Sequence, residues 1–540
     1  MGQAARRDIA EQVVAAAAAR GATLAFGVPG GGSNLDVAGA CDRHGIRFVL
    51  THLEAAAAIM AGVAGALTGA PAIAVATRGP GAVSAANGLA NALLERQPML
   101  LVTDCVYDAD RARVSHQRVD QRAALEPLCV GSTALNGRDP ALADAAVAQT
   151  LVQPPGPVHV DIDPTAHDGH LAPRRACEPT DLTPLLARIA SARRPVIVAG
   201  LGMVTLPPAV RDAAVRTLRE LARQHHVPVL TTYLARGVVP DGAEYSAGIV
   251  TGGTIEGHAL RAADLILGVG LDPVEFLPTA WDYPAPVVNV TGWRIDDARF
   301  FGAALEEEAI GDLAEVLPRI ASVLDVDWQP GSGQHYWRLL QAAARSTIGP
   351  VEQGLTPGEV VQIAAELAPE DSIATVDAGA HMLVAMPLWP VGEPLQALIS
   401  SGYATMGFSL PAAIAASLVR PERAVIAFTG DGGAGMVLGE LETLARLGLP
   451  VVVIVFNDSA LSLIAVKQEP QGHSGPPVVT FAPTDFAAIA TGCGVASWTA
   501  TTTEEYRDAL TAALALRGPA LIDVHVDPRD YPGIFAALRE

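Results

Sequence analysis

Cysteine is scarce in this sequence, and the few that occur are scattered. The chain has 540 residues but only five cysteines, which are Cys41, Cys105, Cys129, Cys177 and Cys493, and no two of them form a CxxC pair. A disulfide framework or a zinc site needs cysteines at short, regular spacings. We therefore expect neither, and we interpret these cysteines as small buried hydrophobic residues.

Positive charge and long apolar runs are scarce as well. The chain carries 36 Lys and Arg against 57 Asp and Glu, for a formal net charge of -21, and it has no Lys/Arg-rich run. Nucleic-acid binding depends on clustered cations, so we expect no nucleic-acid partner. No stretch of about 20 uninterrupted apolar residues occurs, so we expect no membrane partner. The N-terminus resembles an amphipathic helix rather than a signal peptide, and this predicts a cytoplasmic protein.

Short apolar runs alternate with helix-length segments along most of the chain. Half the residues are hydrophobic and only 5% are aromatic, which suits tightly packed α/β layers. Such alternation is typical of parallel βαβ units. The predicted strands are residues 23–28, 47–51, 72–77, 99–103, 158–161, 195–199, 227–232, 265–268, 287–290, 373–376, 398–400, 425–429, 451–456 and 520–525.

Two polar stretches containing proline interrupt the alternation. Residues 163–193 are predicted to be a linker, and residues 325–335 form a second irregular stretch. A chain of this length suggests about three or four domains. We predict an α/β protein with three doubly wound parallel-sheet domains, at residues 1–165, 185–325 and 350–540, in which the first and third share one design.

A Gly-Asp-Gly turn at residues 430–432 follows one predicted strand, and Asp458 follows the next. Glycines let the backbone approach a phosphate, and a helix start offers unpaired N–H groups. A carboxylate such as that of Asp431 is a suitable ligand for Mg²⁺. Because ligands bind at the carboxyl ends of parallel strands, the two aspartates predict a site for Mg²⁺ and a diphosphate. Two ordinary strand-end turns are the alternative explanation.

This combination resembles the thiamin-diphosphate enzyme family, whose pattern is GDG followed by a helix, a strand and an Asn-Asn or Asn-Asp pair. The resemblance implies that Asp431, Asp458 and the Ala460 carbonyl hold Mg²⁺. It spans essentially the whole chain and favours the acetolactate-synthase-like branch. It also implies that the three domains are the pyrimidine-binding, central and diphosphate-binding domains of that family.

The first block resembles the activating-glutamate region of the family. Glu54 follows a predicted strand and begins an Ala-rich segment, and TRGPG at residues 77–81 matches the family's T-x-GPG turn. The implied role of Glu54 is a hydrogen bond to the cofactor's aminopyrimidine ring. The FGVPG loop after the first strand implies that Gly31 lines the substrate pocket. Members usually have adjacent His-Glu, whereas Leu53 separates His52 from Glu54 here.

The resemblance also implies cofactor contacts in the third block. DAGAHM at residues 377–382 resembles the loop that contacts the diphosphate. GYATMGFSLPAAIAA (402–416) resembles the family segment whose methionine separates the two cofactor rings. That methionine is Met406 here. In the same segment, the Ala404 carbonyl is implied to accept a hydrogen bond from the 4′-amino group of the cofactor. The implied cofactor-binding residues are Gly379, Ala380, His381, Ala404, Met406, Gly430, Gly432, Gly433, Ala434, Leu461 and Ser462.

Residues that the resemblance places in the pocket bear on the substrate. His116, Gln117 and Gln121 are candidates for orienting or protonating an intermediate, and an exposed loop is the alternative. Leu463, Ile464 and Lys467 occupy positions that shape substrate choice in relatives. Lys467 replaces an aromatic residue of biosynthetic acetolactate synthases. Lys467 is a candidate for attracting a substrate carboxylate; the alternative is that it lies on a solvated face of a helix and has no contact with substrate.

The resemblance implies decarboxylation of a 2-oxo acid, carboligation or both, with thiamin diphosphate as electron sink. The alternatives are a lyase for 2-hydroxy ketones or 2-hydroxyacyl thioesters, a flavin-dependent oxidase and a non-catalytic subunit. In acetolactate synthases the central domain binds FAD, but GLGM (200–203) and GVGLD (268–272) are poor signals, so we do not expect FAD. The resemblance also implies an assembly of at least two identical subunits, and we expect a homotetramer.

Overall fold

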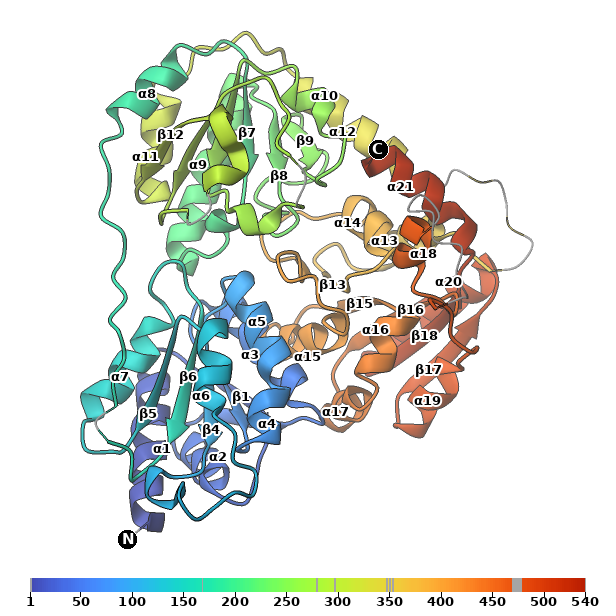
Figure 1. Cartoon of the computed structure of the whole chain (residues 1–540). Helices are drawn as coiled ribbons and strands as arrows, with labels where there is room; N and C mark the ends of the chain where they lie inside the picture. Colours follow the sequence, from blue (N-terminus) through green and yellow to red (C-terminus); the bar gives the residue numbers. More distant parts are fainter. Residues whose placement is uncertain are drawn as a thin grey trace. The chain divides into compact units, whose positions relative to one another are not determined.

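The structure is a computed structural model that describes residues 2–167, 169–277, 280–295, 298–345, 348, 351, 354–468 and 478–539 (Figure 1). These residues form three six-stranded sheets, and the chain divides into two compact units that we describe separately. The first unit comprises Met1–Ala176, Ile414–Arg420 and Val437–Leu447; the remainder of the chain forms the second. Within the described residues, no helix is both long and apolar enough to cross a membrane.

The first unit contains an all-parallel sheet whose inner strands are buried on both faces. The sheet order is β2 (Arg47–Leu50), β1 (Leu24–Val28), β3 (Ala72–Ala76), β4 (Met99–Asp104), β6 (Pro157–Ile162) and β5 (Gly131–Leu135). Helices α1 (Gly2–Ala19), α2 (Ser33–Arg43) and α7 (Pro140–Gln149) share one core cluster with these strands. Helices α3 (Glu54–Thr68) and α5 (Ala86–Leu94) pack on each other, and α3 packs on the sheet. The near-continuous apolar strands reflect this two-sided burial.

The third sheet repeats the topology of the first, as expected for one design. Its order is β14 (Ala397–Ile399), β13 (Ile373–Val376), β15 (Val425–Gly430), β16 (Val451–Asn457), β18 (Ala520–His525) and β17 (Ala496–Ala500). Counted within each sheet, both orders are 2-1-3-4-6-5. Helices that border it are α13 (Pro357–Leu367), α14 (Met382–Leu388), α15 (Ser409–Val419), α16 (Asp431–Met436), α18 (Ser462–Gln468), α19 (Phe486–Gly492), α20 (Thr503–Leu516) and α21 (Tyr531–Arg539).

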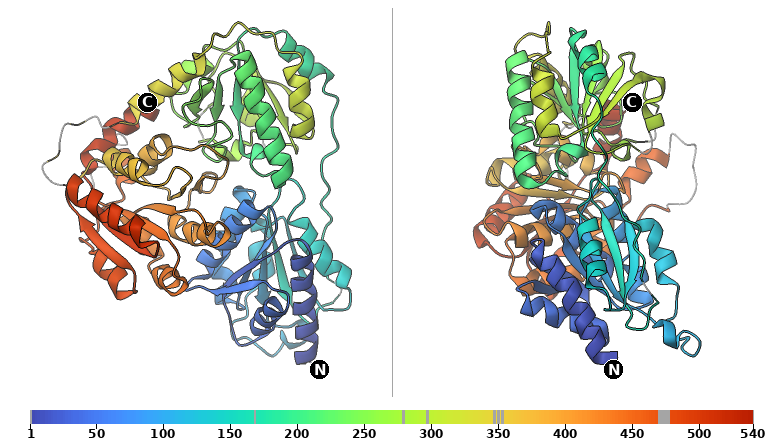
Figure 2. Two further views of the ribbon diagram at one scale, coloured as in Figure 1. Left: turned by 180° about the vertical axis from the view of Figure 1, so that it is seen from behind. Right: turned by 90° about the vertical axis from the view of Figure 1, so that its left-hand side faces the viewer.

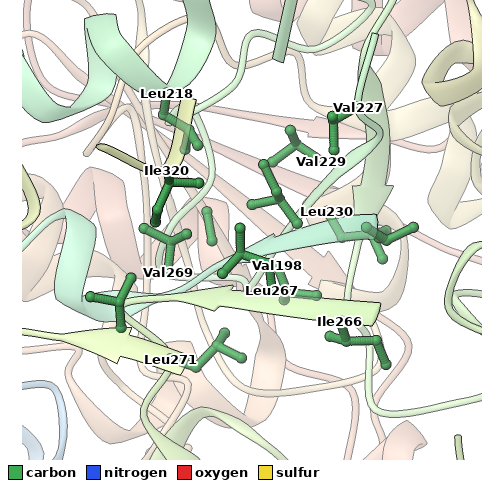
Figure 3. Packing of buried hydrophobic residues seen from close by; sticks show 14 of the residues in the cluster. Val198, Leu218, Val227, Val229, Leu230, Ile266, Leu267, Val269, Leu271 and Ile320 are labelled. Atoms are coloured by element: carbon green, nitrogen blue, oxygen red, sulfur yellow. The ribbon is translucent and has the colours of Figure 1, made fainter. Parts of the chain in front are cut away.

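The central sheet has a different topology. Its order is β12 (Leu305–Ile310), β11 (Val287–Thr291), β10 (Leu265–Val269), β7 (Pro195–Ala199), β8 (Val229–Thr231) and β9 (Ser246–Ile249). Counted within the sheet, this is the doubly wound order 3-2-1-4-5-6. Helices α9 (Pro208–His225, green in Figure 2) and α11 (Leu313–Ala321, olive) pack on each other. In Figure 3, Leu218 and Ile320 from these helices face Val198, Leu267 and Val269 of the sheet.

The predicted fold class is confirmed, and every strand predicted from an apolar run is present. The strands that were not predicted are β5, β9, β12 and β17, and all of them lie at sheet edges. Edge strands need less continuous apolar sequence; β12, for example, is LEEEAI and is only partly buried. The prediction of a linker at 163–193 was partly wrong, because α8 (Thr183–Ala190) lies within it and buries Leu185 and Ile189. Helix α12 (Ser332–Ala343) likewise begins inside the stretch 325–335.

Candidate functional site

The Gly-Asp-Gly turn lies at the carboxyl end of the third sheet. Strand β15 ends at Gly430 and α16 begins at Asp431. Strand β16 runs parallel to β15 with Phe456 opposite Gly430. Asp431 and Asp458 therefore leave adjacent strands at the same edge of the sheet, which is where ligands of parallel sheets bind.

One backbone N–H connects the two aspartates. The N–H of Ala460 donates to Asp431 Oδ2 at 3.1 Å and to Asp458 Oδ1 at 3.1 Å. The Ser462 hydroxyl donates to the other oxygen of Asp458. Ser459 adopts a left-handed conformation (φ 57°), which turns the chain back so that Ala460 can reach both acids. The structure thus brings together the three residues expected to hold a metal.

The electrostatics of the pair suit a bound cation. Burial and, to a lesser extent, the nearby charge of Asp431 raise the pKa of Asp458 to about 6, although the hydrogen bond from Ser462 opposes the shift. Burial also raises the pKa of Asp431. Asp431 is buried and Asp458 is partly buried, so their charges destabilise each other, and a divalent cation between them would relieve this. Among the described residues no group of three or more His, Cys, Asp or Glu side chains surrounds a metal position, so two carboxylates and backbone oxygen are the donors available.

A cavity of about 450 Å³ opens beside the two aspartates, entirely within the second unit. All of the expected cofactor-binding residues of the third block line it except Ala434, which lies buried inside α16. The lining residues expected from sequence are Gly379, Ala380, His381, Ala404, Met406, Gly430, Asp431, Gly432, Gly433, Asp458, Ala460, Leu461, Ser462, Leu463, Ile464 and Lys467. Residues expected to contact cofactor, metal and substrate therefore share one cavity.

Two glycines of the cavity have close neighbours where a side chain would begin. A Cβ at Gly432 would lie 2.8 Å from the Leu461 side chain and 2.9 Å from that of Met406. A Cβ at Gly433 would lie 2.2 Å from the carboxylate of Asp377. Glycine here keeps the backbone exposed to the cavity, as close approach to a phosphate requires.

Asp377 is a structural centre of the site that the sequence did not identify. It is 1% exposed, and its Oδ1 accepts from the N–H groups of Phe408 (2.6 Å) and Ser409 (2.8 Å). Its Oδ2 accepts from the Thr429 hydroxyl at 2.5 Å. Burial raises the pKa of this carboxyl to about 6, although these hydrogen bonds oppose the shift. Asp377 thereby joins the ends of β13 and β15 to the start of α15. Its position directly after a predicted strand was the available signal.

His381 presents an unpartnered nitrogen at the cavity. Its ring is 3% exposed and stacks on Phe456 with centroids 5.3 Å apart. Burial lowers the pKa of His381 to about 4, so the imidazole is neutral near pH 7. Nε2 is buried without a hydrogen-bond partner, which is costly unless a ligand supplies one. The glycine-lined backbone fits the expected diphosphate group, whereas the neutral ring already hydrogen-bonds the Asp377 backbone, so its Nε2 needs a donor.

The other side of the cavity comes from segments that the sequence did not assign to the site. Gly252 and Leu277 of the central block line it, together with Tyr531, Phe535 and Arg539 of α21. Helix α21 packs against α18, which carries Lys467 (Figure 1). No local pattern marks these residues, because they reach the cavity only through tertiary packing.

Glu54 lies in the first unit, where it is the first residue of α3. A Cβ added to Gly81 would come within 3.0 Å of Glu54 Oε1, so the carboxylate lies beside the TRGPG turn. Gly31 and His116 are exposed in the same unit. The contribution of these residues to a reaction stays a prediction.

Gln117 and Gln121 support the TRGPG turn. Gln117 is exposed and left-handed (φ 56°), and its carbonyl lies 2.6 Å from where a Gly79 Cβ would be. Gln121 is 4% exposed; its Oε1 accepts from the Gly79 N–H at 3.0 Å, and its Nε2 donates to Asp161 at 2.6 Å. The side chain of Gln121 is thus occupied in holding the turn, and a contact with substrate stays a prediction.

The central sheet offers a poor site for a flavin dinucleotide at its switch point. The segment after β7 is a short 3-10 helix, Leu201–Met203, and a Cβ at Gly202 would lie 2.7 Å from Gly270. The Leu201 N–H, which could face a phosphate, donates to Glu275 at 2.8 Å instead. Because this carboxylate takes the place that a pyrophosphate needs, the residues present do not fit FAD there.

Comparisons with known proteins identify the family of the chain. The chain matches the N-terminal TPP binding domain, central domain and C-terminal TPP binding domain of thiamine pyrophosphate enzymes at residues 7–124, 182–320 and 377–524. It is 28% identical to acetolactate synthase of Bacillus subtilis (strain 168), over 96% of this chain and 93% of that protein. It is 30% identical to the acetolactate synthase large subunit of Parasynechococcus marenigrum (strain WH8102), over 94% and 85%.

A solved structure shares the fold. The Rhodococcus jostii RHA1 thiamine diphosphate-dependent 4-hydroxybenzoylformate decarboxylase superposes with a TM-score of 0.79 at 23% identity, over 96% of this chain and 99% of that one. The three matched domains cover both predicted cofactor-binding regions. The chain therefore belongs to the thiamine pyrophosphate enzyme family, on its acetolactate-synthase-like branch, as the motif at 430–432 predicted.

Proposed function

We propose that this protein is a Mg²⁺-dependent thiamin-diphosphate enzyme that decarboxylates a 2-oxo acid and can join the remaining acyl unit to a second carbonyl compound. The observation that carries the proposal is the cavity beside Asp431 and Asp458, whose carboxylates share the Ala460 N–H. Acetolactate synthases and a decarboxylase are similar to this chain over nearly its whole length. When bound, thiamin diphosphate supplies the carbon nucleophile and the electron sink.

The chain's own residues have separate roles in this proposal. Asp431, Asp458 and the Ala460 carbonyl hold Mg²⁺, and the glycine backbone at 430–433 binds the diphosphate. Leu461 and Met406 provide apolar contacts to the rings, and the Ala404 carbonyl accepts from the amino group. The Glu54 carboxyl holds a proton that it shares with a ring nitrogen. Glu54 and the cavity lie in different units, so we propose that two subunits build each site, in a homodimer or homotetramer.

Two cations suit the cavity for an anionic substrate. Lys467 and Arg539 line the same space as the apolar residues Leu463 and Ile464. Arg539 donates to the Thr251 carbonyl and, at 3.4 Å, to the Tyr233 hydroxyl, and neither neutral oxygen cancels its charge. A guanidinium has five N–H donors, so a carboxylate can still bind it. The carboxylate lost as CO2 loses its charge in the reaction, so a cation bound to it would stabilise the ground state more than the transition state and slow decarboxylation. We therefore assign Arg539 to a carboxylate that the product retains.

Replacing Arg539 should weaken the binding of carboxylate substrates. We expect Arg539→Met to raise KM for a 2-oxo acid acceptor, whose carboxylate the product retains, by about tenfold or more, because a charged hydrogen bond in a partly buried site contributes about 1.5–3 kcal/mol. Lys467 is exposed, so Lys467→Met should raise KM less than about fivefold. The measurement is steady-state kinetics with a 2-oxo acid and with a neutral aldehyde acceptor.

Arg529→Met is the matched control, since Arg529 pairs with Asp527 in the same C-terminal segment and does not line the cavity. An unchanged KM for every accepted acid in both cavity variants would remove carboxylate recognition by these cations. A KM that rises equally for the neutral aldehyde would indicate damage to the cavity instead.

A substrate screen tests the function itself. The holoenzyme, with Mg²⁺ and thiamin diphosphate, is incubated with 2-oxo acids while CO2 release and carbonyl products are followed together. We expect CO2 release with at least one acid. Cleavage of 2-hydroxy ketones or 2-hydroxyacyl thioesters without CO2 release would favour a lyase. Bound yellow flavin would favour an oxidase, and inactivity on every class would favour a non-catalytic subunit.

A further inference from the structure

Glu440 is a buried acidic residue that the proposed reaction does not use. It is the first residue of α17 (Glu440–Leu447) and is 1% exposed. Its Oε1 accepts from the N–H groups of His52 and Leu53, each at 3.0 Å. Its Oε2 accepts from the Thr443 hydroxyl at 2.8 Å. Helix α17 belongs to the first compact unit, so all of these contacts lie within it.

The two N–H groups that Glu440 binds lie immediately before Glu54. Helix α3 begins at Glu54, and its N-cap residue, Leu53, has an apolar side chain that provides no capping hydrogen bond. Helix starts leave backbone N–H groups without partners, and a carboxylate there also interacts favourably with the helix dipole. Glu440, 388 positions away from His52 in sequence, supplies an acceptor just before the helix start, which the local sequence lacks.

The neighbouring acid Glu442 makes a different contact. Glu442 is exposed, and its Oε2 lies 2.8 Å from Nε2 of the His52 ring. It therefore contacts an exposed side chain, whereas Glu440 contacts the backbone. Burial raises the pKa of Glu440, and its three hydrogen bonds oppose that shift. Burying a carboxylate is costly unless it is well hydrogen-bonded. Two of the three hydrogen bonds of Glu440 come from the backbone of the two residues that precede Glu54.

We propose that Glu440 is a positioning residue: it fixes the backbone at residues 52 and 53 and thereby sets the place of the Glu54 carboxylate. The Glu54 carboxylate itself lies beside Gly81 of the TRGPG turn, so its surroundings in this unit are fixed by both segments. A displacement of about 1 Å at a catalytic group can lower a rate by about 100-fold. This inference rests on the proposed role of Glu54.

The test compares Glu440→Gln, Glu440→Asp and Glu440→Ala with Glu442→Gln as the matched control. Gln retains an oxygen at the same reach, so it can still accept from both N–H groups. Asp retains the charge but is one methylene shorter and withdraws from them. The primary readout is the rate at which the C2 proton of bound thiamin diphosphate exchanges for deuterium, measured by quenched NMR. Cofactor affinity and thermal midpoint are measured on the same holoenzymes.

We expect Glu440→Asp and Glu440→Ala to slow the exchange by about 10- to 100-fold, with cofactor affinity little changed. Glu440→Gln should lose less than about fivefold, and Glu442→Gln should resemble the wild type. If Glu440→Ala fails to fold, the comparison of Gln with Asp still decides the matter. Equal exchange rates in all variants, or a change in thermal midpoint alone, would overturn the proposal.

Glu54→Gln separates this inference from the function on which it rests. If wild-type exchange does not depend on Glu54, the proposed function of Glu54 fails. If exchange depends on Glu54 but is unaffected in Glu440→Asp and Glu440→Ala, only the positioning role of Glu440 fails.

Discussion

Glu54→Gln lowers kcat by about 10²–10⁴-fold, the range that proton transfer by a placed side chain contributes. The amide of Gln has nearly the same shape and can form a hydrogen bond to a ring nitrogen. It cannot take up or release a proton there, so binding is retained while proton sharing is lost. Glu54 is the first residue of α3 in the first unit, away from the metal ligands in sequence. Affinity for cofactor and Mg²⁺ should therefore change little.

The measurement is steady-state kinetics on whichever substrate the screen identifies, together with cofactor titration of the apoprotein. Glu442→Gln serves as a control, because Glu442 is an acid of the same unit whose carboxylate hydrogen-bonds the exposed side chains of His52 and Arg446. Full activity of Glu54→Gln on any accepted substrate would contradict the mechanism proposed here. A loss of activity caused only by weaker cofactor binding would assign Glu54 to binding instead.

Asp431→Ala should abolish Mg²⁺-dependent retention of thiamin diphosphate. The substitution removes one of the two carboxylates at the proposed metal position. Only the carboxyl of Asp458, whose pKa is raised, then remains beside the Ala460 N–H. Loss of a residue that only hydrogen-bonds a metal ligand lowers metal affinity by about 10–100-fold, so the loss of Asp431, a direct ligand in this proposal, should lower it by more. The measurement is the cofactor dissociation constant of the apoprotein at several Mg²⁺ concentrations.

Asp458→Asn is the matched variant. It keeps an oxygen ligand and removes one negative charge beside the diphosphate, so cofactor affinity should change by less than about tenfold. Cofactor binding by Asp431→Ala that is as tight and as Mg²⁺-dependent as in the wild type would place the metal elsewhere.

A mixed dimer of the two inactive variants tests how the site is shared. A heterodimer of Glu54→Gln and Asp431→Ala subunits contains one intact combination if each Glu54 serves the cavity of the other subunit. Co-expressed, doubly tagged heterodimers should then regain activity that neither homodimer has. If the heterodimer is also inactive, each site is built within one chain.

Much of the fold could be predicted because parallel sheets bury their inner strands on both faces. Runs such as VVVIVF in β16 are apolar throughout and stand out in the sequence. The edge strands β5 and β17 contain Ser, Thr and Gly and are partly exposed, so they carry little pattern. The short helix α8 was missed for a similar reason, because only a few of its residues are buried against the central core.

The residues of the candidate site also fall into two groups, those that the sequence predicted and those that only tertiary packing brings together. Asp431, Asp458 and the glycines near them lie in one βαβ unit, where strand direction alone places them at a common edge, so the sequence by itself determined the cofactor class and this half of the site. Tertiary structure alone decided the rest. Asp377 joins three segments, Arg539 enters the cavity from the C-terminal helix, and Glu440 binds the backbone just before a helix from 388 positions away. Local patterns encode which face of a strand or helix is buried, whereas such long-range contacts depend on how whole elements pack, and no short motif specifies that packing.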